Sequence, residues 1–408
     1  MKAIMRDEQE MKYSGVEYLG FIPNDWKVAS AKYFVKISNG SDPKSEGDIP
    51  VYGSGKKSFR TCGEYKEGPA VLLGRKGTID IPQYIDGRYW NVDTAFDVKN
   101  KSGYSLRYYY YLSTCFDYKR YSTQTALPSM TQSNYTDMRI TLPIYFEQQH
   151  ISNYLDDRCS KIDAIIAEAK ASIEEYKELK QAVIYEAVTK GLDKTVEMKH
   201  YNDWFDKCPS NWEYKQIRYL YELRDERNFK PLSEVNLISL YTDQGVIQHA
   251  DIEKTSGNKA ITADGYKKVY PEDIVVNIIL CWMGAMGRSE YQGVTSPAYD
   301  VYKPIGGSKV CSRYYHYLFR TDRFSKKCYT VGRGIMMMRW RTYSSQFRAI
   351  KVPVPPYNEQ IEIANYLDKR ISHMEELINA KQSLIEDLEA YKKSLIYEVV
   401  TGKRKVVA

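Results

Sequence analysis

Pro143–Thr189 reads PIYFEQQHISNYLDDRCSKIDAIIAEAKASIEEYKELKQAVIYEAVT, and Pro355–Thr401 reads PPYNEQIEIANYLDKRISHMEELINAKQSLIEDLEAYKKSLIYEVVT. The two stretches lie 212 residues apart, align without a gap and are identical at about 20 of their 47 positions. Solenoid repeats have much shorter periods, of about 20–50 residues. The pattern therefore indicates a duplicated half-protein.

Both stretches carry apolar residues at alternating steps of four and three, which is the heptad pattern of a coiled coil. Each predicts one helix of about 45 residues, about 67 Å long, that ends near Gly191 or Gly402. Lys180 and Lys392 share one seam position, where a polar residue often fixes register. A heptad helix can dimerise with another chain, but here the chain supplies its own partner, which favours an antiparallel pair within the molecule. The other seam positions are Leu155, Cys159, Ile162, Ile166, Ala169, Ile173, Tyr176, Val183 and Ala187, and Leu367, Ile371, Met374, Ile378, Lys381, Ile385, Leu388, Leu395 and Val399.

The stretches before the two helices repeat more weakly. PNDWKVASAKYFVKI at Pro23–Ile37 matches PSNWEYKQIRYLYEL at Pro209–Leu223, and short Gly-, Tyr- and Val-rich runs typical of strands follow each of them. The sequence therefore predicts an α+β fold with pseudo-twofold duplication: two β-rich modules separated by two long antiparallel coiled-coil helices. We expect modules at 1–142 and 195–352 and long spacer helices at 143–194 and 353–408.

The composition is that of an ordinary globular chain, with 27% charged and 43% apolar residues among 408. The net charge of +7 permits nucleic acid as a partner without proving it. Tyr is unusually frequent, with 38 residues, and suits contact faces because its ring adds area at low entropy cost.

Signals for secretion, membrane insertion and metal binding are not found in the sequence. The N-terminal residues MKAIMRDEQEMKYSG lack the apolar run of a signal peptide. The longest uncharged run, Ile274–Gly287, is shorter than the roughly 20 residues of a membrane helix and predicts a buried strand pair. The seven cysteines lack CxxC spacing and the five histidines lack ligand spacing, which favours a reducing, cytoplasmic compartment. We expect no metal, no cofactor and no membrane partner.

Motifs for catalysis are weak or broken. GSGKKS at Gly53–Ser58 lacks the first Gly and the last Ser or Thr of a P-loop. VPPY at Val354–Tyr357 is similar to the tetrapeptide of adenine methyltransferases, but Val354 cannot hold an amine, and the prolines suit a helix entry. GRKG at Gly74–Gly77 presents two cations on a tight turn that is either merely solvated or contacts phosphate or guanine. The residues alone predict a two-headed binding protein with no catalytic residues.

Several longer motifs recur in a fixed order. PNDW and PSNW open the two halves, LLGRKGTID with WNVDTAFDV and DIVVNIILCWMGAMGRS with GVTSPAYDVY lie inside the modules, and LPIYFEQQHISNYLD and PPYNEQIEIANYLD open the helices. With these motifs, essentially the whole chain resembles the DNA-specificity subunit of type I restriction–modification systems. One departure is Tyr145–Phe146, where the family commonly has Pro-Leu or Pro-Pro before Glu-Gln.

The resemblance implies a role and partners. Each module would be a target recognition domain that reads one half of a bipartite, asymmetric site in double-stranded DNA. The helices would be the spacer between the half-sites. Two methyltransferase subunits would dock on the chain, restriction and translocase subunits would join for cleavage, and the chain itself would have no catalytic centre.

Cationic and hydroxyl side chains in Gly-rich turns beside strands are the candidates for reading DNA, because they can donate to phosphate or to base edges. Each could equally be a solvated surface group. The candidates are Lys56, Lys57, Arg60, Arg75, Lys76 and Thr78 in the first module, and Arg288, Ser289, Tyr299, Lys309, Arg333, Arg339 and Arg341 in the second.

Polar residues that recur at the two helix starts are the candidates for binding two identical methyltransferase subunits. The alternative explanation is helix capping and ion pairing along the helix, where each pair stabilises the helix by about 0.3 kcal/mol. The candidates are Glu147, Gln148, Asp156 and Arg158, with Glu359, Gln360, Asp368 and Arg370 as their counterparts.

Two other classes of protein stay open at this point. A structural scaffold would use the coiled coil to join two protein-binding modules, and its binding would be insensitive to salt and to DNA sequence. An enzyme with an unrecognised nuclease or transferase site would turn over substrate as the purified chain alone.

Overall fold

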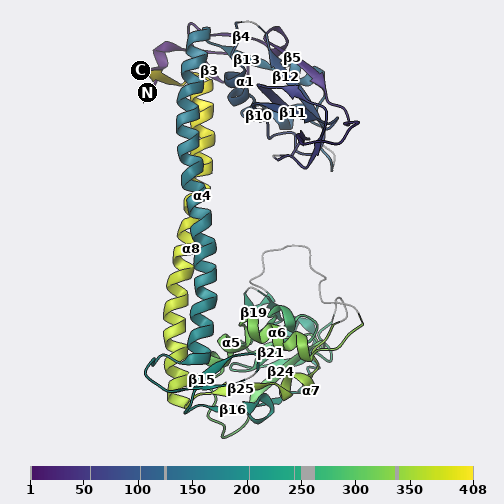
Figure 1. The fold of residues 1–408 in the computed structure, drawn as a ribbon, viewed down its shortest axis with the longest axis vertical. Coiled ribbons are helices and arrows are strands. Elements are labelled where there is room, and N and C mark those ends of the chain that lie inside the picture. Colours follow the sequence, from purple (N-terminus) through teal and green to yellow (C-terminus); the bar gives the residue numbers. More distant parts are fainter. Residues whose placement is uncertain are drawn as a thin grey trace. The chain divides into compact units, whose positions relative to one another are not determined.

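The computed structural model describes residues 2–55, 57–101, 103–123, 126–201, 203–242, 244–249, 262–335 and 340–407. The chain divides into two compact units, each with one β-rich module and a part of both long helices. Unit 1 is Met1–Lys170 with Gln382–Ala408, and unit 2 is Ala171–Lys381. Figure 1 shows the sheets of each module beside the ends of the two helices. The α+β fold with duplicated halves is confirmed.

The long helices are α4, Tyr145–Lys190, and α8, Tyr357–Val400. Each starts shortly after a proline, Pro143 or Pro356. Each ends at a glycine with a positive φ, 70° at Gly191 and 75° at Gly402. Only glycine adopts this conformation without steric cost, so the two glycines terminate the helices where the sequence predicts. No described helix combines the length and the apolar character that crossing a bilayer requires.

The heptad seam predicted from the sequence packs α4 against α8 in both units. In unit 1, Lys392 Nζ of α8 lies 2.6 Å from Asp163 of α4. In unit 2, Lys180 Nζ of α4 lies 2.5 Å from Glu375 of α8. These are the same ion pair in the two repeats. The apolar seam residues beside them, Ile162 and Ile371 among them, are buried, so each lysine is a polar member of a mostly apolar seam.

The module of unit 1 is built on two four-stranded sheets. The first has the order β10-β9-β12-β5, and its central strand β9 is buried throughout; the second has the order β7-β6-β11-β8. The strands are β5 Val35–Asn39, β6 Ile49–Tyr52, β7 Arg60–Cys62, β8 Lys66–Glu67, β9 Ala70–Gly74, β10 Gln83–Ile85, β11 Arg88–Asn91 and β12 Ala95–Asn100. Helices α1 Leu106–Ser113, α2 Tyr118–Tyr121 and α3 Gln132–Asp137 complete the module.

Three two-stranded sheets complete unit 1. They pair β1 with β26, β2 with β3, and β4 with β13. The first of them joins the two ends of the described chain, because Lys2–Met5 runs antiparallel to Arg404–Val407. The remaining bounds are β2 Met11–Tyr13, β3 Phe21–Pro23, β4 Lys27–Ser30 and β13 Arg139–Leu142.

The described part of the unit 2 module contains one four-stranded sheet, β17-β24-β21-β22, where that of unit 1 contains two. The strand pair predicted for Ile274–Gly287 is confirmed, since β21 pairs antiparallel with β22. The sheet strands are β17 Tyr221–Leu223, β21 Ile274–Asn277, β22 Met286–Arg288 and β24 Tyr299–Pro304. The helices are α5 Ser312–Phe319, α6 Asp322–Val331 and α7 Ser344–Ala349. Two-stranded sheets pair β14 Met198–His200 with β15 Lys207–Pro209, β16 Glu213–Gln216 with β25 Lys351–Val354, β18 Ile238–Tyr241 with β19 Gly245–Gln248, and β20 Lys267–Val269 with β23 Gly293–Thr295.

A buried ion pair recurs in the two module cores. Asp97 on β12 accepts from Lys66 at 3.0 Å and from the hydroxyl of Tyr89 at 2.8 Å. Asp300 on β24 accepts from Lys267 at 2.9 Å. The two aspartates belong to the motifs AFDV and AYDV that carry the family resemblance. The aspartates of these motifs therefore form polar contacts inside the module and have a structural role.

Candidate nucleic-acid interface

In unit 1, two loops are tied together through their backbones at the end of the central strand β9. The Gly74–Thr78 turn follows β9, and the other loop is closed by a hydrogen bond from Thr123 N to Ser129 O at 3.1 Å. Gly77 N donates to Pro128 O at 2.9 Å, and the backbone N of Met130 donates to Arg75 O at 3.0 Å. These hydrogen bonds tie the backbone of the turn to the backbone of the second loop. The backbone positions of the two cations in the turn are therefore fixed.

Unit 2 builds the same pair of loops. The segment after β21 is tied to the second loop by Thr342 N, which donates to Ile278 O at 2.9 Å. The second loop is closed by reciprocal backbone hydrogen bonds between Arg333 and Arg341, at 2.9 and 3.0 Å. Trp340 braces it by stacking on Tyr329 at 4.8 Å between ring centroids. We call the two loops of each unit its paired-loop edge, and of these loops the structure describes Gly74–Thr78 with 123 and 126–129, and Ile278–Leu280 with 333–335 and 340–341.

Four of the sequence-predicted cations lie on these edges. Lys76 is exposed and Arg75 half-buried in unit 1, and both Arg333 and Arg341 are exposed in unit 2. The Arg75 side chain makes only a long contact of 3.4 Å, to the carbonyl of Asp93. Thr78, half-buried, completes the turn of unit 1. These groups have the charge and the access that contact with phosphate or base edges requires.

Three other candidates are not part of the two loops of either edge. Lys57 is exposed. Arg60 is also exposed, but its guanidinium bonds to Asp42 at 2.7 Å. Lys309 is exposed, and its carbonyl accepts from Gln360 at the start of α8. Two further candidates, Lys56 and Arg339, lie outside the described residues.

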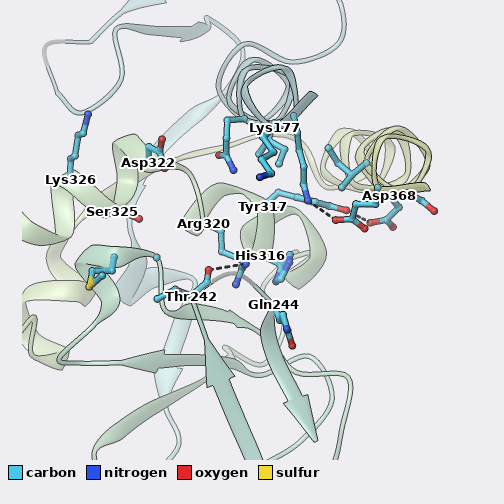
Figure 2. Close-up of a pocket in the computed structure, with 18 of the residues that line it drawn as sticks. Lys177, Thr242, Gln244, His316, Tyr317, Arg320, Asp322, Ser325, Lys326 and Asp368 are labelled. Atoms are coloured by element: carbon cyan, nitrogen blue, oxygen red, sulfur yellow. Dashed lines mark hydrogen bonds and ion pairs between the residues drawn. The ribbon is translucent and has the colours of Figure 1, made fainter. Parts of the chain in front are cut away.

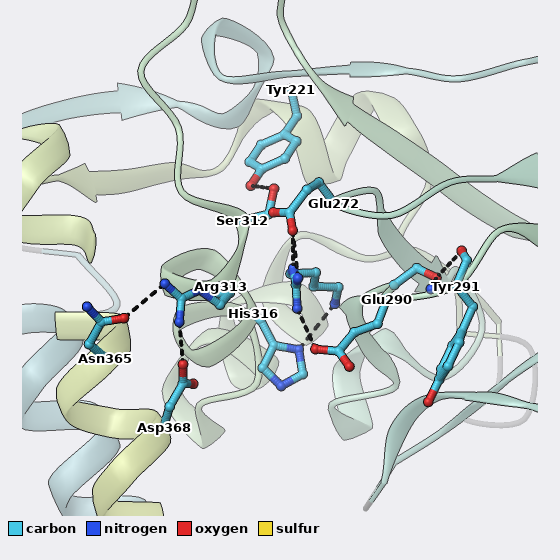
Figure 3. Close-up of polar contacts among 11 residues, drawn as sticks. Tyr221, Glu272, Glu290, Tyr291, Ser312, Arg313, His316, Asn365 and Asp368 are labelled. Carbon is cyan, nitrogen blue, oxygen red and sulfur yellow. Dashed lines mark hydrogen bonds and ion pairs between the residues drawn. The ribbon is translucent and has the colours of Figure 1, made fainter. Parts of the chain in front are cut away.

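The structure corrects the choice of Arg288 and Ser289. The Arg288 guanidinium bonds to Glu272 and Glu290, and its side chain is mostly covered. Figure 3 labels the two glutamates and marks polar contacts of their carboxylates with dashed lines. Ser289 is fully buried and donates to Tyr291 O at 2.9 Å. Tyr299 is half-buried against the module core, and desolvation raises the pKa of its hydroxyl. Ser289 has no exposed surface with which to contact DNA. Arg288 could contact DNA only if its ion pairs with Glu272 and Glu290 were broken.

The predicted partner contacts at the helix starts prove to hold the module to the helix in each unit. Glu147 accepts from the indole of Trp26 at 3.0 Å, and Glu359 accepts from Trp212 at 2.9 Å. Desolvation raises the pKa of both carboxyls, and the indole hydrogen bond opposes that shift. The tryptophans are those of PNDW and PSNW, so two distant motifs meet in one contact.

The glutamines and aspartates at the helix starts are also engaged. Gln148 and Gln360 are buried, and their side-chain carbonyls accept from the backbone N of Ser105 and Cys311, both at 2.9 Å. Asp156 accepts from Arg107 and Tyr111, and Asp368 accepts from Arg313 and Tyr317. Arg158 lies over the ring of Tyr154, and Arg370 is exposed. Gln148 and Gln360 therefore offer a partner no surface, whereas the other six residues of the set are half-buried or exposed.

A cavity of about 770 Å³ lies between the helices and the module in unit 2. Figure 2 shows His316 and Arg320 beside it. His316 Nδ1 accepts from the backbone N of Arg288 at 3.1 Å, and desolvation with the nearby cations lowers its pKa to about 3. Arg320 donates to the carbonyls of Met286 and Thr242. His316 and Arg320 are thus engaged with the protein itself, and among the described residues no cluster of potential metal ligands is present.

None of the residues predicted from the sequence lies on the second loop of the unit 1 edge. Leu127 is 61% exposed on that loop, and in unit 2 Ile335 is 95% exposed between the paired arginines. The segment 122–131 has no charged residue and gives no signal of its own. Its place between two short helices, matching 332–343 in the other half, is the signal that could have found it.

Comparison with known proteins gives one family. The family model described as "Type I restriction modification DNA specificity domain" matches residues 23–175 and 209–387. The chain is 23% identical to the type I restriction enzyme MjaVIII specificity subunit of Methanocaldococcus jannaschii, over 99% of this chain and 89% of that protein. It is 21% identical to the EcoDI specificity subunit of Escherichia coli, over 94% of this chain and 90% of that protein.

Solved structures share the fold. A chain from a structure of a type I restriction–modification system aligns with a TM-score of 0.69 at 13% identity, covering 94% of this chain and 99% of that one. The HsdS subunit of Thermoanaerobacter tengcongensis aligns with a TM-score of 0.50 at 12% identity, covering 94% of this chain and 98% of that one.

Proposed function

The chain belongs to the type I restriction–modification DNA specificity family, and from this premise we propose that each module reads one half of a bipartite, asymmetric site in double-stranded DNA. The observation that supports this most is the paired-loop edge: Met130 N donates to Arg75 O in unit 1 and Thr342 N donates to Ile278 O in unit 2, at equivalent positions of the repeat, whereas the side chains on the two edges differ. A shared frame with different contact residues suits two different half-sites.

The chemistry of the two edges supports direct contact with DNA. Unit 1 places Arg75 and Lys76 on its edge, and unit 2 places Arg333 and Arg341. Arginine can bond bidentately to guanine, and either cation can neutralise a phosphate. We propose these four residues as the principal contacts, with Thr78 beside them and Lys57, Arg60 and Lys309 as outlying ones.

In the proposed role the chain binds partner subunits and catalyses no reaction itself. The chain would direct two methyltransferase subunits to the site, with restriction and translocase subunits joining for cleavage, and the helices would serve as the spacer. Methyl transfer and cleavage would take place in those partners, and this chain would be non-catalytic.

Replacing both cations of the unit 1 edge should weaken DNA binding in a salt-dependent way. For Arg75→Ala with Lys76→Ala we expect the slope of log K against log salt to fall by about 2, because about 0.9 counterions are released per phosphate contact. The measurement is a salt titration of DNA binding by the assembled complex. A matched control is Lys36→Ala with Arg88→Ala, two exposed cations of the same module. An unchanged slope in the first variant removes Arg75 and Lys76 from the interface.

A further inference from the structure

The second loop of each paired-loop edge is closed at an equivalent place. In unit 1, the backbone N of Thr123 donates to Ser129 O at 3.1 Å. In unit 2, Arg333 and Arg341 exchange backbone hydrogen bonds of 2.9 and 3.0 Å. In both units the residue that follows the closure donates to the first loop. The two closed loops are therefore counterparts in the repeat, although their lengths and sequences differ.

Each closed loop presents a large aliphatic side chain to solvent. Leu127 is 61% exposed, and Ile335 is 95% exposed, more than any other large hydrophobic residue in the part of the chain that the structure describes. Leu127 lies beside the turn of the first loop, because a Cβ added at Gly77 would be 3.7 Å from its Cδ1. Ile335 contributes almost no buried surface, so hydrophobic burial in the fold does not account for its aliphatic character.

Exposed cations accompany both aliphatic side chains. Ile335 stands in the loop that the exposed Arg333 and Arg341 close. Lys76, also exposed, forms a backbone bridge with Ser129, two residues from Leu127. Protein-binding surfaces instead gather apolar residues into a patch whose centre is depleted of charge. A single aliphatic group among cations suits a partner that is anionic and carries isolated apolar groups.

The major groove of DNA is such a surface. Phosphates flank it, and the C5 methyl of thymine is the one apolar group that its base edges present. The other base-edge groups are hydrogen-bond donors or acceptors, which contact with an aliphatic side chain would leave without partners.

We infer that Leu127 and Ile335 are specificity-determining residues, each of which contacts the methyl group of a thymine in the half-site that its unit reads. This inference rests on the proposed function and deepens it, because it names a feature of the DNA that cationic side chains do not recognise. The cations of each edge read guanine or bind phosphate, whereas the aliphatic side chain selects for thymine.

Replacing thymine by uracil tests the contact directly, because it removes the methyl group and nothing else. The full chain, assembled with the methyltransferase subunits of its own system, is bound to a duplex that carries the methylated motif identified by long-read sequencing. Each thymine of the motif is replaced in turn. For the unchanged chain we expect one replacement in each half-site to weaken binding about fourfold, the effect of losing one buried methyl group. Ile335→Ala and Leu127→Ala should each remove this effect in one half-site and keep it in the other.

Two further variants separate the methyl contact from a general effect of the substitution. Ile335→Val keeps a branched aliphatic surface and should retain most of the difference between thymine and uracil. Phe229→Ala is the matched control, since Phe229 is 80% exposed in unit 2 but is not part of its edge; it should retain all of the difference. Thermal unfolding of Ile335→Ala should be unaltered, because the side chain it truncates is exposed.

The inference is overturned if the unchanged chain tolerates uracil at every position of the motif. It is also overturned if either alanine variant weakens binding to the thymine and uracil duplexes by the same factor. That result would indicate another role, such as insertion of the side chain between base steps. An unchanged complex that does not prefer the motif to unrelated DNA would instead overturn the proposed function itself.

Discussion

Replacing Asp300 by Ala is expected to lower the free energy of unfolding of unit 2 by about 3–5 kcal/mol, and replacing Asp97 by Ala is expected to destabilise unit 1 by a smaller amount. The first substitution leaves Lys267, whose side chain is 7% exposed, without its carboxylate partner, whereas Lys66 is 25% exposed and keeps a hydrogen bond to Asn91. Removing one partner of a buried ion pair costs far more than the pair contributes, because the remaining charge stays desolvated. Hydrogen exchange should show the loss only in the unit that carries the substitution.

A surface ion pair of the same module is the control for this prediction. Glu67 bonds to Arg88 at 3.2 Å, and both side chains are largely exposed. Glu67→Ala should cost less than about 1 kcal/mol, since water screens such pairs. If Asp97→Ala destabilises unit 1 no more than Glu67→Ala does, the AFDV motif does not act through its buried aspartate. Asp97→Leu with Lys66→Met should recover much of the loss.

Replacing both Arg333 and Arg341 by Ala is expected to weaken DNA binding about 10- to 1000-fold and to relax one half of the recognised sequence. Each specific arginine contact discriminates by about 1–3 kcal/mol. The backbones of Arg333 and Arg341 form an isolated antiparallel bridge, so the two residues lie side by side. Competition binding against duplexes altered in either half-site measures both effects. The half read by unit 1 should keep its full discrimination.

Arg288 is the control residue for this prediction in unit 2. Because Glu272 and Glu290 hold its guanidinium, Arg288→Ala should reduce stability and leave DNA discrimination within about two-fold of the unchanged chain, a difference below about 0.5 kcal/mol. If Arg288→Ala relaxes the sequence preference while the Arg333 and Arg341 variant does not, the paired-loop edge of unit 2 is not the surface that reads DNA.

The helices and the duplication could be predicted from the sequence because both leave a direct pattern there. The heptad spacing gives the seam, and the lysines at 180 and 392 lie on it with carboxylates across the pair. The two terminal glycines give the helix ends. These features depend on periodicity and on backbone conformation, which are local properties of the chain.

The candidate site was predicted less well because its contacts join residues far apart in the sequence. Recurrence of Glu147 and Asp156 in both halves could not distinguish an internal contact from a partner contact until Trp26 and Arg107 were seen beside them. Arg288 has the same local sequence signal as an available arginine, and only folding brings Glu272 to it. A charge pattern shows which side chains are cationic, whereas their availability depends on neighbours that only the fold supplies.

The central claim is that this chain selects a bipartite DNA site through its two modules. Long-read methylation mapping tests it in cells that express the methyltransferase subunit of the same system with this chain, without it, or with residues 1–142 exchanged for those of another family member. We expect a split motif that is methylated only in the presence of the chain, with one half changed by the exchange. A motif that persists without the chain, or an exchange that leaves both halves unchanged, would contradict it.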